Sequence, residues 1–265
     1  MTYYKNKTVW ITGASSGIGK EMAIQLSGLG AHLILSSRKR VGLQKVAQLC
    51  QSSSIELLPL DLEDHESLDR LISANDDLLS SVDILINNGG ISQRSDVKKT
   101  SFDVYKKLMD INYFGTVKLS QGMLPHFTKK NAGHYVVISS MAGKFGVPGR
   151  SGYSASKMAL HGFFDALRAE LSATAIKTTI ICPGYIKTDI SKNALTSDGS
   201  PQGTMDEAQR NGMPVETMVK KVLAAIAGGQ AEYHIGGLRE VHMAGLVSRL
   251  FPGLLRKIIA KSKVT

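Results

Sequence analysis

Apolar residues fall into two alternating patterns along this chain. Short runs rich in Val, Ile and Leu stand between turn residues, as is typical of strands buried in a parallel sheet. Longer segments between them repeat an apolar residue every three or four positions, which is the spacing of an amphipathic helix. The short runs predict strands at 8–12, 32–37, 55–62, 83–88, 134–140, 178–183 and 231–237.

The helical spacing appears in the connections between these strands. A strand followed by a helix and another strand predicts a parallel sheet with crossover helices. The pattern therefore favours the α/β class, with a doubly wound parallel sheet of about seven strands and helices on both faces. The predicted helices cover about 17–29, 40–50, 64–79, 101–128 and 151–174.

Residues 188–213 interrupt the alternation. This segment is polar, rich in Gly and Ser, and longer than most connections in a compact domain. It follows the end of a strand, where α/β proteins place their ligands. We therefore expect a substrate lid rather than a disordered loop.

The segment 241–265 also departs from the pattern. It is basic, contains no acidic residue, and is interrupted at Pro252 and Gly253. We interpret it as an amphipathic extension of a catalytic domain that spans residues 1–240. It could rest on an anionic membrane or pack on protein. Its apolar residues at helical spacing are Leu246, Val247, Leu250, Phe251, Leu254, Leu255, Ile258 and Ile259.

A glycine-rich turn, TGASSGIG, occupies residues 12–19 directly after the first strand. Glycines at 13, 17 and 19 allow a tight turn and a close approach of the backbone to a pyrophosphate. The following helix offers its N-terminal amides to the same charge. The context of strand, turn and helix favours a dinucleotide site over a simple tight turn.

The end of the second predicted strand suggests which dinucleotide binds. An acidic residue there would select NAD, but the chain has Ser37, Arg38 and Lys39. An arginine can hold a 2′-phosphate with two hydrogen bonds, so NADP(H) is expected and NAD(H) is less favoured. Asp61, after the third strand, could accept a bond from the adenine amino group or serve as a helix cap.

Tyr153 and Lys157 lie four residues apart, on one face of a predicted helix. Such pairs also occur on ordinary helix surfaces. A nearby ammonium favours a phenolate, so we expect Lys157 to lower the pKa of Tyr153 from about 10. That shift would bring the tyrosine into the range of general acid–base catalysis.

Composition and charge narrow the classes of partner. The 265 residues carry 32 Lys and Arg against 22 Asp and Glu, a net charge of +10, but the lysine pairs are scattered. No basic patch with interleaved aromatic residues indicates nucleic-acid binding. Two cysteines are too few for a disulfide framework, and no apolar run predicts a signal peptide or a membrane span. We expect a cytoplasmic protein, with possible peripheral membrane contact, and no metal site.

Taken together, the glycine turn, NNGG at 87–90 and Tyr-x-x-x-Lys resemble the short-chain dehydrogenase/reductase family over about residues 7–188. The resemblance implies a single Rossmann-fold domain. The tail resembles the C-terminal extension of the branch that includes 11β-hydroxysteroid dehydrogenase-like and dehydrogenase/reductase member 7-like proteins. Two differences from the common motifs are Gly89, where the motif has Ala, and Ser16, where many NADP-using relatives have a basic residue.

The family resemblance implies the roles of the site residues. Tyr153 would be the general acid or base, Ser140 would hold the substrate oxygen, Lys157 would bind the nicotinamide ribose, and Asn112 would support Lys157 through a water chain. The implied cofactor contacts are Gly13, Ser15, Ser16, Gly17, Ile18, Gly19, Ser37, Arg38, Lys39, Asp61, Leu62, Asn88, Gly89, Tyr153, Lys157, Pro183, Gly184, Ile186 and Thr188.

The resemblance also implies a reaction and an assembly. A small carbonyl compound would be reduced, or its alcohol oxidised, and apolar residues in the lid are compatible with a steroid, a retinoid or a long-chain ketone. A 3-ketoacyl-carrier-protein reductase and a non-catalytic NADP sensor are alternatives. A homodimer or homotetramer is expected, through helices at about 101–128 and 151–174.

Overall fold

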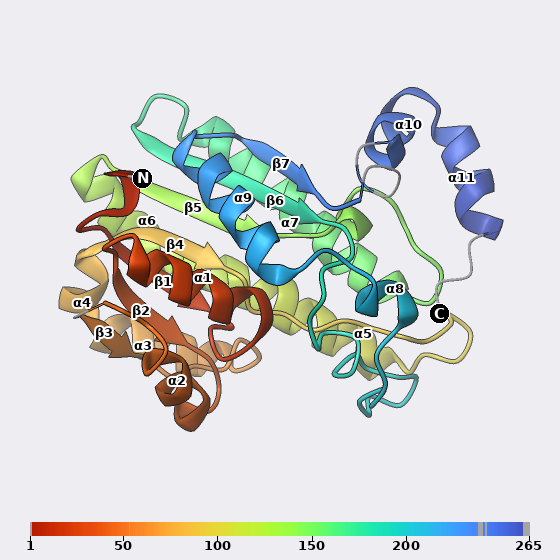
Figure 1. Cartoon of the computed structure of the whole chain (residues 1–265), viewed down its shortest axis with the longest axis horizontal. Helices are drawn as coiled ribbons and strands as arrows, with labels where there is room; N and C mark the ends of the chain where they lie inside the picture. Colours follow the sequence, from red (N-terminus) through yellow and green to blue (C-terminus); the bar gives the residue numbers. More distant parts are fainter. Residues whose placement is uncertain (1, 53, 238–240, 242, 262–265) are drawn as a thin grey trace.

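Seven parallel strands form the centre of the molecule (Figure 1). The structure is a computed structural model that describes residues 2–52, 54–237, 241 and 243–261. The strand order is β3-β2-β1-β4-β5-β6-β7, so the chain returns to the middle of the sheet after β3. The predicted seven-stranded α/β fold is confirmed. The strands are β1 (Thr8–Thr12), β2 (His32–Ser36), β3 (Ile55–Leu57), β4 (Val82–Asn87), β5 (Gly133–Ile138), β6 (Ile176–Pro183) and β7 (Glu232–Ile235).

Helices cover both faces of the sheet. Helices α1 (Gly17–Gly28), α2 (Arg40–Ala47) and α9 (Val215–Ala227) pack on one face, and α1 and α9 lie in front of the sheet in Figure 1. The opposite face is covered by α3 (His65–Ala74), α4 (Asp76–Ser80), α6 (Gly115–Lys130) and α7 (Ser151–Glu170).

The central strands read as continuous apolar runs because both of their faces are buried. In β1, Val9 and Ile11 pack under α1 and α9, whereas Trp10 points to the other face. All three side chains are fully buried. Successive side chains of a strand alternate between faces, so one strand supplies both cores.

Several predicted boundaries are wrong. β3 ends at Leu57 instead of continuing to residue 62, and Pro59, which has no N–H to donate, follows shortly after it. The helix predicted at 64–79 is two helices that meet at Asn75. Helix α9 and the short α8 (Glu207–Arg210) are not among the predicted elements.

The helix predicted at 101–128 is also divided. Helix α5 (Phe102–Met109) continues through a π-helical turn, η2 (Asp110–Phe114), into α6. Such turns insert one extra residue and frequently mark functional sites. This turn carries Asn112, whose side chain is fully buried.

The predicted lid folds against the rest of the domain. Leu195 exchanges backbone hydrogen bonds with its neighbours on the loop after β4: its N–H donates to Ser92 O at 2.8 Å, and its carbonyl accepts from Arg94 N at 2.8 Å. The segment is therefore attached to the loop that follows β4.

The C-terminal segment forms α10 (Ala244–Leu250) and α11 (Pro252–Lys261), which lie at one end of the molecule in Figure 1. Of the apolar side chains described in residues 241 and 243–261, only Leu255 and Val241 are buried, and several large ones are exposed. The packing of this tail on its own domain is thus slight among the described residues. The exposed ones are Met243, Leu246, Leu250, Phe251, Leu254 and Ile258.

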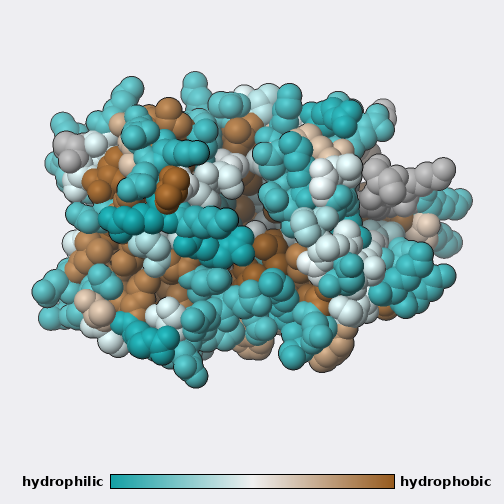
Figure 2. Space-filling model, turned by 90° about the horizontal axis from the view of Figure 1, so that it is seen from below, coloured by the Kyte–Doolittle hydropathy of each residue, from teal (hydrophilic) through white to brown (hydrophobic). Residues whose placement is uncertain are grey.

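The surface is otherwise mixed. Figure 2 shows a largely hydrophilic face on which hydrophobic side chains gather in separate patches. Among the described helices, none combines the length and the hydropathy needed to cross a bilayer.

Candidate active site

Hydrogen bonds join the turn after β1 to the end of β4. The hydroxyl of Thr12 accepts from the backbone N–H groups of Asn88 at 3.0 Å and Gly89 at 2.9 Å. The Asn88 amide donates in return to Thr12 O at 2.9 Å. Gly13 has a φ of +64°, and a Cβ there would lie 2.9 Å from the Asn88 amide nitrogen. The turn therefore needs glycine for both its conformation and its packing.

A groove of about 570 Å³ runs along this turn. It lies at the C-terminal ends of the strands, where the strand order reverses between β1 and β4, which is the ligand position of doubly wound folds. Most of the predicted cofactor residues line it. They are Gly13, Ser15, Ser16, Gly17, Ile18, Ser37, Arg38, Asp61, Leu62, Asn88, Gly89 and Thr188.

Two predicted cofactor residues, Gly19 and Lys39, line neither this groove nor the adjoining cavity. A Cβ on Gly19 would lie 2.5 Å from both the Asn88 amide nitrogen and Gly13 O, so this glycine allows α1 to pack on the turn. Lys39 is the residue that precedes α2.

The groove fits a dinucleotide by its polar groups as well as by its place. The buried hydroxyl of Ser37 has no hydrogen-bond partner among the described residues. An unpaired buried hydroxyl is costly, and a ligand hydroxyl or phosphate would satisfy it. Arg38, the next residue in the chain, also lines the groove.

A second cavity, of about 170 Å³, adjoins the groove. It is lined by three of the four predicted catalytic residues, namely Ser140 after β5, and Tyr153 and Lys157 on α7. The fourth, Asn112 on the π-helical turn, is not among the described residues that line this cavity. The predicted cofactor residues Pro183, Gly184, Ile186 and Thr188 also line this cavity.

Lys157 is buried and lines the second cavity next to Gly90, a residue that lines both the cavity and the groove. Its ammonium donates to the carbonyl of Ile138 at 2.8 Å. Burial disfavours the charged form and lowers the pKa of Lys157 to about 8. The side chain therefore loses its proton at a lower pH than an ordinary lysine.

The expected effect of Lys157 on Tyr153 is wrong for this structure. Burial raises the pKa of Tyr153, and the groups that oppose the rise are the Ser140 hydroxyl, by a hydrogen bond, and the charges of Arg150 and Arg94. Lys157 Nζ lies 6.0 Å from the centroid of the Tyr153 ring. The desolvation of both side chains outweighs the expected attraction.

Asn112 ties three segments together. Its amide donates to Ile91 O at 3.0 Å and to the Ser156 hydroxyl at 2.9 Å, and its oxygen accepts from Ile91 N at 2.8 Å. The side chain therefore joins the loop after β4 to α7, one residue from Lys157. This is a direct structural contact, in addition to the water-mediated role implied by the family.

The wall of the second cavity contains residues that were not predicted. Apolar ones include Met141, Phe145 and Val147, and two arginines, Arg94 and Arg150, also line it. Arg150 stands three residues before Tyr153, a spacing that could have drawn attention to it. Arg94 lies in a loop whose pattern contained no signal.

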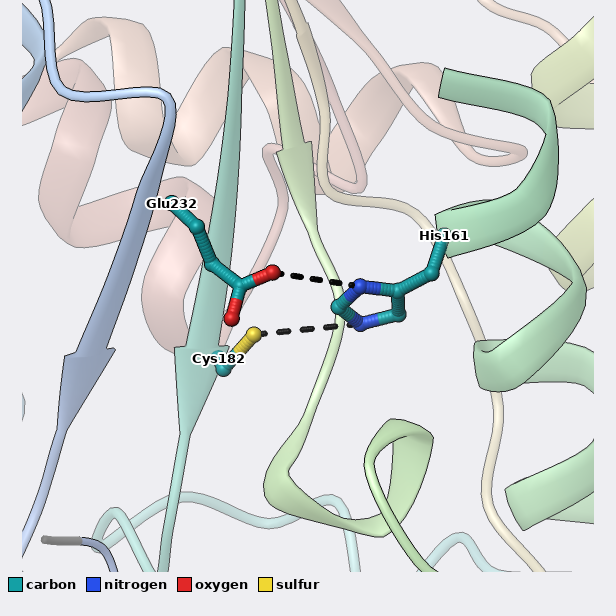
Figure 3. A group of neighbouring side chains, drawn as sticks. All are labelled: His161, Cys182 and Glu232. Carbon is teal, nitrogen blue, oxygen red and sulfur yellow. Dashed lines mark hydrogen bonds and ion pairs between the residues drawn. The ribbon is translucent and has the colours of Figure 1, made fainter. Parts of the chain in front are cut away.

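A cluster of polar side chains joins α7, β6 and β7 (Figure 3). His161 of α7 lies between Cys182 of β6, at 3.8 Å from Nε2 to Sγ, and Glu232 of β7, at 3.5 Å from Nδ1 to Oε2. These are residue types that can bind a metal. However, Glu232 already pairs with the ammonium of Lys144 at 3.0 Å, which balances its charge.

The same histidine contacts the catalytic loop. His161 Nε2 lies 3.0 Å from the Ser139 hydroxyl, which in turn donates to Lys157 O at 3.3 Å. The cluster thus holds α7 against the loop that carries Ser140. Cys182 is fully buried, and both cysteines of the chain are free.

Comparison with known proteins agrees with this geometry. The family model for short chain dehydrogenase matches residues 7–199. The chain belongs to the short-chain dehydrogenase/reductase family of oxidoreductases, as its motifs had predicted.

The curated relatives belong to one branch of that family. Dehydrogenase/reductase SDR family protein 7-like of Drosophila melanogaster is 38% identical over 97% of this chain and 81% of its own length. Dehydrogenase/reductase SDR family member 7B of Xenopus tropicalis is 41% identical over 89% of this chain and 79% of its own. The predicted likeness to member 7-like proteins is confirmed.

Solved structures share the fold. A short-chain dehydrogenase from Streptomyces avermitilis has a TM-score of 0.82 and 24% identity, covering 97% of this chain and 98% of that one. One from Sphingobium yanoikuyae, in complex with NADPH, has a TM-score of 0.76 and 25% identity, covering 98% of this chain and 97% of that one.

The burial of Lys157 predicts a pH-dependent stability. The folded pKa of about 8 lies below the ordinary 10.5, so between these values the unfolded chain binds a proton that the folded chain does not. Stability from this group therefore rises with pH. Between pH 7.5 and pH 9.5, the unfolding free energy of wild type should rise by about 2 kcal/mol more than that of Lys157→Met, because the variant lacks this titrating group.

Urea unfolding of the cofactor-free proteins at both pH values measures this difference. Lys129→Met, at an exposed position, is the matched control and should track wild type. Equal pH dependence in wild type and Lys157→Met would show that Lys157 keeps its ordinary pKa.

Proposed function

We propose that this protein is an NADP(H)-dependent oxidoreductase that interconverts a carbonyl compound and its alcohol. The observation that carries the proposal is that the groove along the glycine turn and the cavity lined by Lys157 share lining residues, Asn88 and Gly90 among them. The glycine turn lines the groove, and Ser140 and Tyr153 line the cavity. Family membership supports hydride chemistry, and solved neighbours in complex with NADP or NADPH support the choice of cofactor.

The chain's own residues would position the reactants and move the proton. When bound, the nicotinamide supplies or accepts the hydride. Gly13, Gly17 and the start of α1 would hold the pyrophosphate, and Lys157 the ribose. In reduction, Ser140 donates a hydrogen bond to the carbonyl oxygen, and Tyr153 donates its proton to the same oxygen. In oxidation, Tyr153 withdraws the proton from the alcohol.

The electrostatics of the cavity favour Tyr153 as an acid in the resting site. Burial raises the pKa of its phenol, so the proton is present at neutral pH. The hydrogen bond from Ser140 and the charges of Arg150 and Arg94 favour the phenolate that remains after transfer. A carbonyl substrate therefore meets a protonated tyrosine whose conjugate base has stabilising partners.

Tyr153→Phe removes the transferable proton and little else. We expect kcat with NADPH and a reactive ketone to fall by about 100- to 10,000-fold, because general acid catalysis is lost. The affinity for NADPH, measured by fluorescence titration, should stay within a few-fold of wild type. Turnover close to wild type in this variant would exclude the proposed role.

Arg38 is proposed to select the phosphorylated cofactor. Its side chain lines the groove beside Ser37, and a guanidinium matches the charge and geometry of a phosphate. Lys39 follows it in the sequence but does not line the groove.

Arg38→Gln should raise KM for NADPH by about tenfold while leaving KM for NADH nearly unchanged, because only the 2′-phosphate loses a charged partner. Arg40→Gln removes a charge from the same region outside the groove and serves as the control. Steady-state kinetics with both cofactors measure the effect. A parallel loss with NADPH and NADH would refute phosphate selection by Arg38.

The substrate is proposed to be at least partly lipophilic. Met141, Phe145, Val147, Ile186 and Ile190 are apolar residues that line the second cavity. Ile190 belongs to the segment 188–213, which we propose to be the lid over the substrate. Ketones with an aliphatic or aromatic body fit this lining by the hydrophobic effect.

A homo-oligomer is proposed to form through α5, α6 and α7. Phe102 at the start of α5, Phe114 at the end of the π-helical turn and Met158 on α7 are all large exposed apolar side chains. An isologous contact through these helices would cover them.

The tail is proposed to contact the surface of an anionic membrane, as a peripheral attachment of a cytoplasmic protein. Six of its large apolar side chains are exposed rather than packed on the domain, and its charged side chains are all basic. That combination is typical of interfacial helices.

Deletion of 243–265 should abolish sedimentation with vesicles that contain phosphatidylserine, because the apolar face and its basic residues are lost together. Size-exclusion chromatography of both proteins serves as the control for oligomeric state. Unchanged sedimentation would end the membrane proposal. A lower oligomeric state without any vesicle binding by wild type would assign the tail to a subunit contact.

A further inference from the structure

Two buried arginines share one carboxylate beside the proposed substrate cavity. Arg94 Nε donates to Asp206 Oδ2 at 2.7 Å, and Arg150 Nη2 donates to the same oxygen at 3.3 Å. All three side chains are at most 10% exposed. One carboxylate balances one guanidinium, so the group holds a surplus positive charge away from water.

The surplus charge faces the cavity. Both arginines line it, whereas Asp206 does not. The other charged side chain in the lining is Lys157, and no carboxylate is present among the described lining residues. An anion that enters this cavity therefore meets cations without a competing acid.

The two arginines differ in how well their donors are used. The Arg94 guanidinium donates hydrogen bonds to Asp206, to the Ser92 hydroxyl at 2.9 Å and to Gln93 O, so these donors already have partners. Arg150 bonds Asp206 through one amino group, and its buried Nε has no partner among the described residues. A buried guanidinium with a free donor is costly unless a ligand completes it.

Arg150 is close to the reacting atoms. It stands at the start of α7, three residues before Tyr153, and its guanidinium carbon lies 5.4 Å from the centroid of the Tyr185 ring, which also lines the cavity. Its charge is near enough to act on the Tyr153 phenol. A single substrate molecule could therefore place an anionic group at Arg150 and its carbonyl group at Tyr153.

We propose that Arg150 is an anion-binding residue of the substrate site, and that the substrate is a carbonyl compound with an apolar body and one carboxylate or phosphate group. This inference rests on the proposed function, because it refines the substrate class of the same site. Asp206 comes from the predicted lid, so the arginine pair also attaches that segment over the bound anion.

Matched ketones test the proposal with the full chain and saturating NADPH. One series pairs keto acids of increasing chain length with their methyl esters, and a second pairs a hydroxyketone with its phosphate monoester. For at least one spacing, kcat/KM should be about 10- to 100-fold higher for the anionic member, the range for a buried hydrogen bond to a charged group. The better series identifies the anion.

Variants locate the effect. Arg150→Gln should bring the anionic-to-neutral ratio of kcat/KM close to one, mainly through KM, whereas Arg70→Gln, which removes an exposed charge, should keep the wild-type ratio. Asp206→Asn should lower KM for the anionic member, because both arginines then lack their carboxylate. A merely structural triad predicts instead that both Arg150→Gln and Asp206→Asn impair the two members equally.

The outcomes separate this inference from the proposed function. Reduction of neutral ketones as fast as anionic ones by wild type would overturn the anion site and leave the oxidoreductase intact. Oxidation of NADPH with none of the ketones would overturn the function itself. In that case calorimetry with a saturated fatty carboxylate and an alkyl phosphate on the NADP-loaded protein decides the anion site. Equal binding by wild type and Arg150→Gln, or none at millimolar concentration, would refute it.

Discussion

The hydrogen bonds between the end of β1 and the end of β4 fix the position of the glycine turn, on which the start of α1 and the groove depend. The Thr12 hydroxyl receives two backbone N–H groups from Asn88 and Gly89, and the Asn88 amide returns a bond to Thr12 O. These bonds close the gap at which the strand order reverses. Because the glycine turn is held against Asn88, the start of α1 has one position relative to the sheet, and the groove has one wall.

The second constraint is the burial of positive charge. Lys157, Arg94 and Arg150 are all removed from water around one small cavity, which is unfavourable for a protein that contains no ligand. Lys157 responds by a lowered pKa and a bond to Ile138 O, and the arginines respond by sharing Asp206. Groups that a ribose hydroxyl or a substrate anion would satisfy are retained at the expense of stability, as is common at functional sites.

Much of the site could be predicted because its residues are recognised by local spacing. Tyr153 and Lys157 share a helix, and the glycine turn is continuous in the sequence, so their geometry follows from one element each. Element boundaries were less predictable. The π-helical turn around Asn112 is stabilised by bonds to Ile91 and Ser156, and these contacts depend on packing rather than on local propensity.

By itself, the sequence determined the α/β class, the glycine turn, the positions proposed to be catalytic and the family, because each depends on the spacing of apolar residues or on residues close together in the chain. Only the tertiary structure decided the electrostatics. It showed that burial, not Lys157, dominates the pKa of Tyr153, and it brought Asp206 to Arg94 and Arg150 across 112 and 56 residues of sequence. Desolvation and long-range ion pairs are properties of the folded environment, and no local pattern encodes the neighbours that create them.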